Sequence, residues 1–154
     1  MGYIEANLLA DESVIYKARL HWIIFAKSVA LIFLGLVFML IQPLIAGIIV
    51  LIGCGALLSP IVDYLTSEFG VTNKRVIIKI GFIRRRTVEL LLRHVEAISV
   101  EQSVTGRMLD YGSITLTGTG GVKELFGNLR APLEFRRRIQ GEASQENVSA
   151  AGSR

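Results

Sequence analysis

Two long apolar runs in the first half of the chain limit what it can fold into. Residues 22–41 and 44–62 are each about twenty residues long, and Lys27 is their only charged residue. Helices of roughly this length cross the hydrocarbon core of a bilayer. We therefore expect two membrane-spanning helices. A cleaved signal sequence is the competing interpretation, but acidic residues precede the first run and a second run follows at once.

The connection between the runs is Gln42-Pro43, which leaves no room for a folded loop. The two helices are therefore expected to form a tight antiparallel hairpin, with both ends of the chain on one side. Basic residues flank both outer ends of the hairpin, whereas the turn carries none. Because cytoplasmic flanks are enriched in Lys and Arg, both termini of this multi-pass protein are expected in the cytoplasm.

Small and polar residues recur every seven positions on each apolar run. They are Ser28, Gly35 and Gln42 on the first and Ala46, Gly53 and Pro60 on the second. Membrane helices associate through such faces, so we expect these two stripes to pack together. Packing between protomers is the alternative, because Gly47 and Gly55 offer the second helix another small surface.

After the hairpin the pattern changes to the alternation typical of strands, as in residues 75–80. Turn signals separate six expected strands, and residues 14–22 alternate well enough to supply a seventh. Pro132 suits the first turn of a short closing helix, and the tail after it is polar and aperiodic. We thus expect an N-terminal segment (1–21), a helical hairpin (22–62), a β domain with a C-terminal helix (63–140) and a disordered tail (141–154).

Three stretches carry a resemblance to a known family. They are Val71-Thr72-Asn73-Lys74-Arg75-Val76-Ile77, Gly81-Phe82-Ile83-Arg84-Arg85-Arg86 with Val95-Glu96-Ala97-Ile98-Ser99-Val100, and the segment from Glu101 to Gly112. With the preceding hairpin they resemble the bacterial pleckstrin-homology-like (PH-like) membrane proteins of the YdbS-like family. The resemblance implies an α+β membrane protein of the bacterial inner membrane. Its soluble part would be an antiparallel barrel of six or seven strands, closed by a helix and without catalytic residues.

The segment from Glu101 to Gly112 also has a physical interpretation. Gly106 and Gly112 bracket a short excursion between two strands, suited to a single helical turn. Met108, Leu109 and Tyr111 lie within it. We expect these three side chains to plug one end of the barrel.

Residues that could carry chemistry do not form a known motif. His21 and His94 are far apart, Cys54 is alone within an apolar run, and Asp63 and Glu68 stand where the chain leaves the second run. The glycines at 118–121 suit a hairpin turn better than a phosphate loop. We therefore predict no enzyme, no metal site and no cofactor.

The net charge of +4 raises the question of an anionic partner. The basic residues crowd next to the apolar runs, so anionic lipid is favoured over nucleic acid. The candidate lipid contacts are Lys74, Arg75, Lys79, Arg84, Arg85 and Arg86. Plain solvation of these charges is an equally open interpretation.

The function expected from these features is that of a membrane-anchored interaction or scaffold module. It would work at the cytoplasmic face and bind a membrane-protein partner, another copy of the chain or anionic lipid. The alternative is an accessory subunit of a transport or export complex, in which the hairpin packs into a larger assembly.

Overall fold

The computed structural model describes residues 2–82 and 85–152, with side chains as far as Glu146. The chain divides into two compact units. One unit combines Met1–His21 with Ser67–Arg154, and the other is Trp22–Thr66. Each unit is described separately below.

The helical unit is an antiparallel pair. A 3₁₀ turn, η1 (Trp22–Phe25), leads into α2 (Ala26–Phe38), and α3 (Pro43–Thr66) follows. The first helix ends before residue 41, since residues 39–41 form the turn and Pro43 starts the next helix. Among the described residues, only α3 is long and apolar enough to cross a membrane, and Trp22–Phe38 is a shorter apolar stretch. A hairpin of two full spans is thus not shown.

Small residues lie between α2 and α3. Gly35 and Gly53 are both buried, and a Cβ on either would come within 2.7 Å of Val50 or Ile32, respectively. Ser28 is buried and its Oγ donates a hydrogen bond to the Ala56 carbonyl at 3.1 Å. Ala46 is also 1% exposed, whereas Gln42 is exposed in the turn and Pro60 is half-buried. Gly47 and Gly55 face open space.

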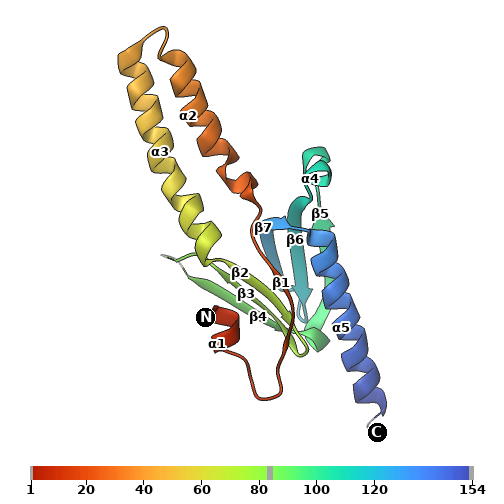
Figure 1. The fold of residues 1–154 in the computed structure, drawn as a ribbon. Coiled ribbons are helices and arrows are strands. Elements are labelled where there is room, and N and C mark those ends of the chain that lie inside the picture. The colour runs from red at the N-terminus through yellow and green to blue at the C-terminus, as the bar shows by residue number, and fades with distance from the viewer. Residues whose placement is uncertain (1, 83–84, 153–154) are drawn as a thin grey trace. The chain divides into compact units, whose positions relative to one another are not determined.

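The other unit contains two antiparallel sheets (Figure 1). The first sheet has the order β1 (Val14–Ala18), β2 (Glu68–Thr72), β3 (Arg75–Ile80) and β4 (Arg86–Leu91). The second consists of β5 (Val95–Glu101), β6 (Tyr111–Gly118) and β7 (Lys123–Arg130). The helices of this unit are α1 (Tyr3–Ala6), η2 (Leu92–His94), α4 (Val104–Met108) and α5 (Pro132–Gly152).

The expected closed barrel is not observed. The short η2 helix turns the chain between β4 and β5, so β5 starts a new sheet instead of pairing with β4. Among the residues that the structure describes, the other two edges, at β1 and β7, are joined only by an isolated bridge between Leu20 and Leu129. The β domain is therefore a pair of packed sheets.

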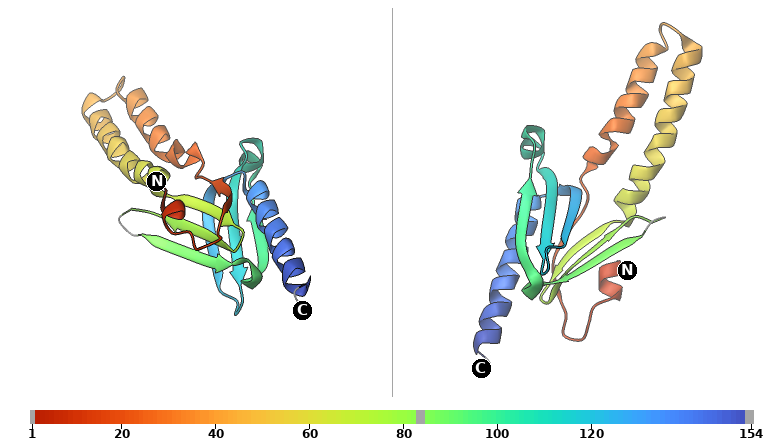
Figure 2. Two further views of the ribbon diagram at one scale, coloured as in Figure 1. Left: turned by 60° about the horizontal axis from the view of Figure 1, so that its bottom comes forward. Right: turned by 180° about the vertical axis from the view of Figure 1, so that it is seen from behind.

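Aromatic side chains fill the space between the two sheets and α5. Phe69 of β2 meets Phe126 of β7 edge to face, with ring centroids 6.2 Å apart. It meets Phe135 of α5 in the same way at 6.5 Å. Ile139, one helical turn later, is also fully buried. These contacts place α5 across the sheets (Figure 2).

The expected disordered tail is also not observed. Helix α5 continues to Gly152, so most of residues 141–154 are helical. Good helix formers such as Glu142, Ala143 and Glu146 extend the helix without a hydrophobic stripe. The prediction relied on periodicity alone and ignored intrinsic propensity.

Candidate functional site

The described members of the six basic residues proposed as a lipid contact do not lie together. Lys74 and Arg75 are at one end of β3, and Lys79 lies at the other, opposite Glu68 and Thr87. A six-residue strand is about 17 Å long. Arg85 and Arg86 are at the Lys79 end, and Arg84 lies outside the described residues.

Arg75 is part of a buried ion pair with Glu12. Its Nε and Nη2 atoms donate to the two carboxylate oxygens of Glu12, each at 2.9 Å. The Glu12 side chain is fully buried and also accepts hydrogen bonds from Thr72 Oγ1 and from the Leu9 backbone. Burial alone would raise the pKa of Glu12, but these hydrogen bonds outweigh it and lower the pKa. Arg75 also contacts Glu89 and is therefore a structural residue.

The other described cations of this set also have partners. Lys74 Nζ donates to the Ala10 carbonyl at 2.9 Å, and Arg86 pairs with Glu124. Lys79 and Arg85 lie over the Tyr3 ring at 4.8 and 6.0 Å from its centroid. Much of the basic run therefore helps to hold the N-terminal segment and neighbouring strands in place.

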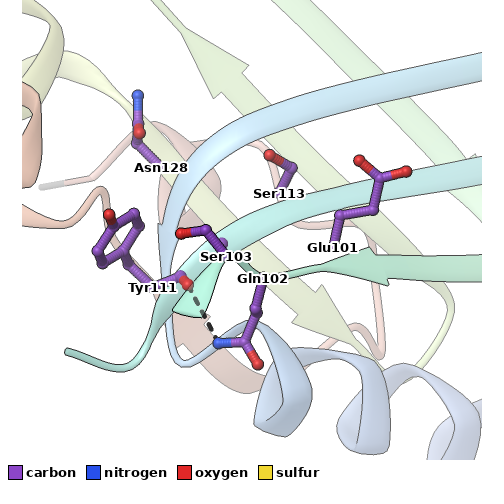
Figure 3. Close-up of a pocket in the computed structure, with 7 residues that line it drawn as sticks. Glu101, Gln102, Ser103, Tyr111, Ser113 and Asn128 are labelled. Atoms are coloured by element: carbon purple, nitrogen blue, oxygen red, sulfur yellow. Dashed lines mark hydrogen bonds between the residues drawn. The ribbon is translucent and has the colours of Figure 1, made fainter. Parts of the chain in front are cut away.

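A second region lies where β5 passes into β6. We call residues 103–110, which contain α4, the α4 tip. Ser103 Oγ accepts a hydrogen bond from the Gly106 N–H at 3.0 Å and so caps α4. Gln102 Nε2 donates to the Tyr111 carbonyl at 3.1 Å, across the base of the tip (Figure 3). Thr105 Oγ1 bonds to the Tyr111 hydroxyl at 3.1 Å.

Two glycines are required for the close approach of the backbone at the base of the tip. A Cβ on Gly106 would come within 2.6 Å of the Tyr111 carbonyl oxygen. A Cβ on Gly112 would meet the Glu101 carbonyl oxygen at the same distance. Backbone oxygens cannot move aside as a flexible side chain can. The sequence of this segment therefore determines a rigid loop.

The apolar residues of the tip do not plug the domain. Val104 is 78% exposed, Met108 81% and Leu109 43%. Tyr111 is half-buried, and its ring stacks on His21 with centroids 5.1 Å apart. The predicted plug is therefore wrong for Met108 and Leu109, which face outward.

His21 connects the base of the tip to the other strands. Its backbone N–H donates to the Asn128 carbonyl at 2.7 Å. Asn128 adopts a positive φ of 55° in an irregularity where β7 pairs with β6, as β-bulges do when they redirect a strand. Burial lowers the pKa of His21, and the charge of Arg130 lowers it further. Leu109 and Asp110 oppose the shift.

A shallow polar pocket of about 340 Å³ lies beside the tip (Figure 3). Its labelled residues are Glu101, Gln102, Ser103, Tyr111, Ser113 and Asn128. Among the described residues, no group of three or more His, Cys, Asp or Glu side chains is placed to hold a metal ion.

Two packed antiparallel sheets with a C-terminal helix across them define a PH-like interaction module. The model of the bacterial PH domain family matches residues 17–151, and the chain belongs to this family. The match begins at Lys17 and includes the whole helical unit. No curated protein and no solved structure gives a match. The narrower YdbS-like assignment stays a prediction.

Proposed function

We propose that the chain is a membrane-anchored interaction module. The helical unit lies in the bilayer and holds the PH-like unit at the cytoplasmic face of a bacterial inner membrane. There the PH-like unit binds a membrane-protein partner, another copy of the chain or anionic lipid. Tethering raises its effective concentration for partners that share the membrane.

The exposed surface of the helical unit carries this proposal. Its two helices bury small residues against each other and leave the large apolar side chains outside. Phe33 is 67% exposed, Leu40 91% and Leu51 74%. A water-soluble domain rarely exposes so large a continuous apolar surface. Lipid removes that cost along the full length of α3.

The distribution of charge supports the orientation. Lys17 and Arg19 precede the helical unit, and Lys74, Arg75 and Lys79 follow it, whereas residues 39–43 of the turn are uncharged. Positively charged flanks remain on the cytoplasmic side. Both termini are therefore proposed to be cytoplasmic.

The lipid contact is narrower in this proposal than the basic run suggests. Lys79, Arg85 and Arg86 remain as candidates because they lie at the end of β3 and β4 near Phe82, which is 67% exposed. Arg75 is excluded because its guanidinium is bound to Glu12 and Glu89 and is only 12% exposed. Arg86 also pairs with Glu124, but its side chain is 64% exposed. Each arginine or lysine near an anionic surface contributes about 1 kcal/mol of attraction.

Fractionation and topology reporters test the anchoring. We expect the full chain to remain in the membrane pellet after alkaline carbonate washing. Reporters fused to either end should be active only in the cytoplasm. Recovery of the intact chain in the soluble fraction, or an external carboxyl end, would overturn the proposal.

A further inference from the structure

We propose that the α4 tip inserts into the interfacial layer of the bilayer that holds the helical unit. Val104, Met108 and Leu109 enter the headgroup region, and nearby arginines contact the phosphates. The inference rests on the proposed anchoring. It adds a contact between the PH-like unit and lipid that is separate from Lys79, Arg85 and Arg86.

The apolar surface of the tip is local and continuous. Val104 and Met108 are four residues apart on α4 and therefore lie on one side of it. Leu109 follows directly, so the three exposed apolar side chains lie within six residues. Isolated apolar residues on a surface are ordinary. A cluster on one short projecting element is typical of a contact surface.

The tip is preorganised, so its exposure is not a consequence of a loosely packed loop. The Ser103 cap, the Gln102 hydrogen bond and the pair between Thr105 and Tyr111 fix its backbone and base. A rigid element loses little conformational entropy when it binds. The apolar side chains are therefore presented in a fixed arrangement.

The chain connection beside the base of the tip supports lipid as the occupant. Tyr111, at the base of the tip, stacks on His21, and the residue after His21 is Trp22, the first residue of the helical unit. Adjacent Cα atoms are about 3.8 Å apart. Tryptophan is enriched at the membrane interface. If Trp22 lies at the headgroups, then His21, on which Tyr111 stacks, is one residue from them along the chain.

The charges around the tip are suited to an anionic leaflet. Arg107 lies in the last turn of α4. The backbone N–H of Arg130, at the end of β7, donates to the carbonyl of Arg19, two residues before His21, at 3.0 Å. Asp110 directly precedes β6 and Glu101 ends β5, so acidic residues also lie near these arginines. Apolar side chains bordered by cations are the composition of interfacial membrane contacts.

The contact would restrict how the PH-like unit is presented. A domain held only by its two chain connections can tilt and rotate above the membrane. A third contact through the tip fixes one end of β5 and β6 at the lipid surface. Partners would then meet a constant face of the domain.

Lipid quenching in the full chain tests the inference. Cys54 is replaced by Ser, and single cysteines are introduced as Val104→Cys, Met108→Cys and Val122→Cys. Val122 is the matched control, because it is 60% exposed in the turn at the opposite end of β6, about 24 Å away. Each variant carries an environment-sensitive fluorophore and is reconstituted in vesicles of zwitterionic and anionic phospholipid at low protein density.

We expect brominated lipid to remove most of the emission from positions 104 and 108 and iodide to have little effect on them. Position 122 should show the reverse. Adding Met108→Asp to the Val104→Cys variant should restore access of iodide to position 104. The inference is overturned if positions 104 and 108 behave like position 122. It is also overturned if they are shielded from iodide but not quenched by lipid, because a protein would then cover the tip.

Flotation of the same vesicles separates the two proposals. If the protein does not float with the lipid, the anchoring itself is wrong. If it floats and the tip stays open to iodide, the anchoring stands and only the tip contact is wrong.

Discussion

The two regions that sequence and structure single out differ in how completely their side chains are partnered. Around Arg75 the charges are dense, but each carboxylate or guanidinium described there has a partner within the domain. In the α4 tip the polar groups are bonded internally, and the apolar side chains are the ones left uncovered. The basic run suggested a binding surface, whereas the tip suggested a structural plug. The structure instead pairs Arg75 within the domain and leaves Met108 and Leu109 exposed.

The difference teaches that charge along a sequence does not measure charge available to a ligand. Arg75 is bound by a carboxylate 63 residues earlier in the chain. An exposed apolar cluster is the more informative observation, since burial is the default for such residues. The following predictions test whether the contrast between the two regions is real, beginning with the largest effect.

Breaking the ion pair should cause the largest loss of stability. Replacing Glu12 by Ala leaves the Arg75 guanidinium, which is 12% exposed, without its main partner. Removal of one member of a buried ion pair costs about 3–5 kcal/mol. The free energy of unfolding of the full chain in detergent, monitored by denaturant titration, should fall by this amount.

The control is an exposed ion pair of the same unit. Glu134 lies four residues before Arg138 on α5, with the two side chains 36% and 50% exposed. Glu134→Gln should cost only about 0.3–0.5 kcal/mol. Equal losses in Glu12→Ala and Glu134→Gln would show that the Arg75 region is solvated surface after all.

Rigidity of the tip depends on the close approach at its base. Gly112→Ala places a methyl group 2.6 Å from the Glu101 carbonyl oxygen and 2.7 Å from the Gln102 side chain. Overpacking of this kind costs about 1–3 kcal/mol. Hydrogen exchange should increase across residues 101–112. Gly127→Ala is the matched control, because its added methyl group meets only Ser113 Oγ at 4.0 Å. Similar exchange in both variants would contradict a preorganised tip.

Local patterns predicted the elements well. The expected strand 75–80 coincides with β3, and Pro132 begins α5 as expected. Alternation over six or seven residues and a proline at the first helical position are local signals, readable without tertiary information. Helix α5 was extended by propensity, a weaker local signal that the prediction did not weigh.

Long-range pairing was not predictable in the same way. No local pattern indicates that Glu12 bonds Arg75, or that η2 separates two sheets instead of continuing one barrel. The direction in which Met108 and Leu109 point depends on the backbone at Gly106 and Gly112. Their apolar character suggested burial, and only the three-dimensional path of the loop reveals their exposure.

Acidification should loosen the tip before it affects the ion pair. The folded pKa of His21 lies below its ordinary value near 6.5, because of burial and Arg130. The unfolded chain therefore binds a proton first as the pH falls. Stability from His21 is complete above the ordinary pKa and is lost below it. Glu12 acts in the same direction, but its contribution is lost only below about 4.5.

Hydrogen exchange at two pH values tests this order. Corrected for intrinsic rates, protection of residues 101–112 should decrease between about pH 7.5 and about pH 5.5, on either side of the ordinary histidine value. Residues 9–14, which surround Glu12, should keep their protection over the same range. His21→Gln should remove the decrease. A decrease of equal size in His21→Gln would assign it to another group.

The smallest effect on stability should come from the tip itself, and its smallness is the informative result. Met108 is 81% exposed, so Met108→Asp in detergent should change the free energy of unfolding by no more than about 0.5 kcal/mol. Met108→Ala provides a control without added charge. A loss comparable to that of Gly112→Ala would mean that Met108 packs against the domain. A negligible loss leaves its exposed methyl and thioether without a role in folding, and the reason for an apolar residue at this position must then lie outside the domain.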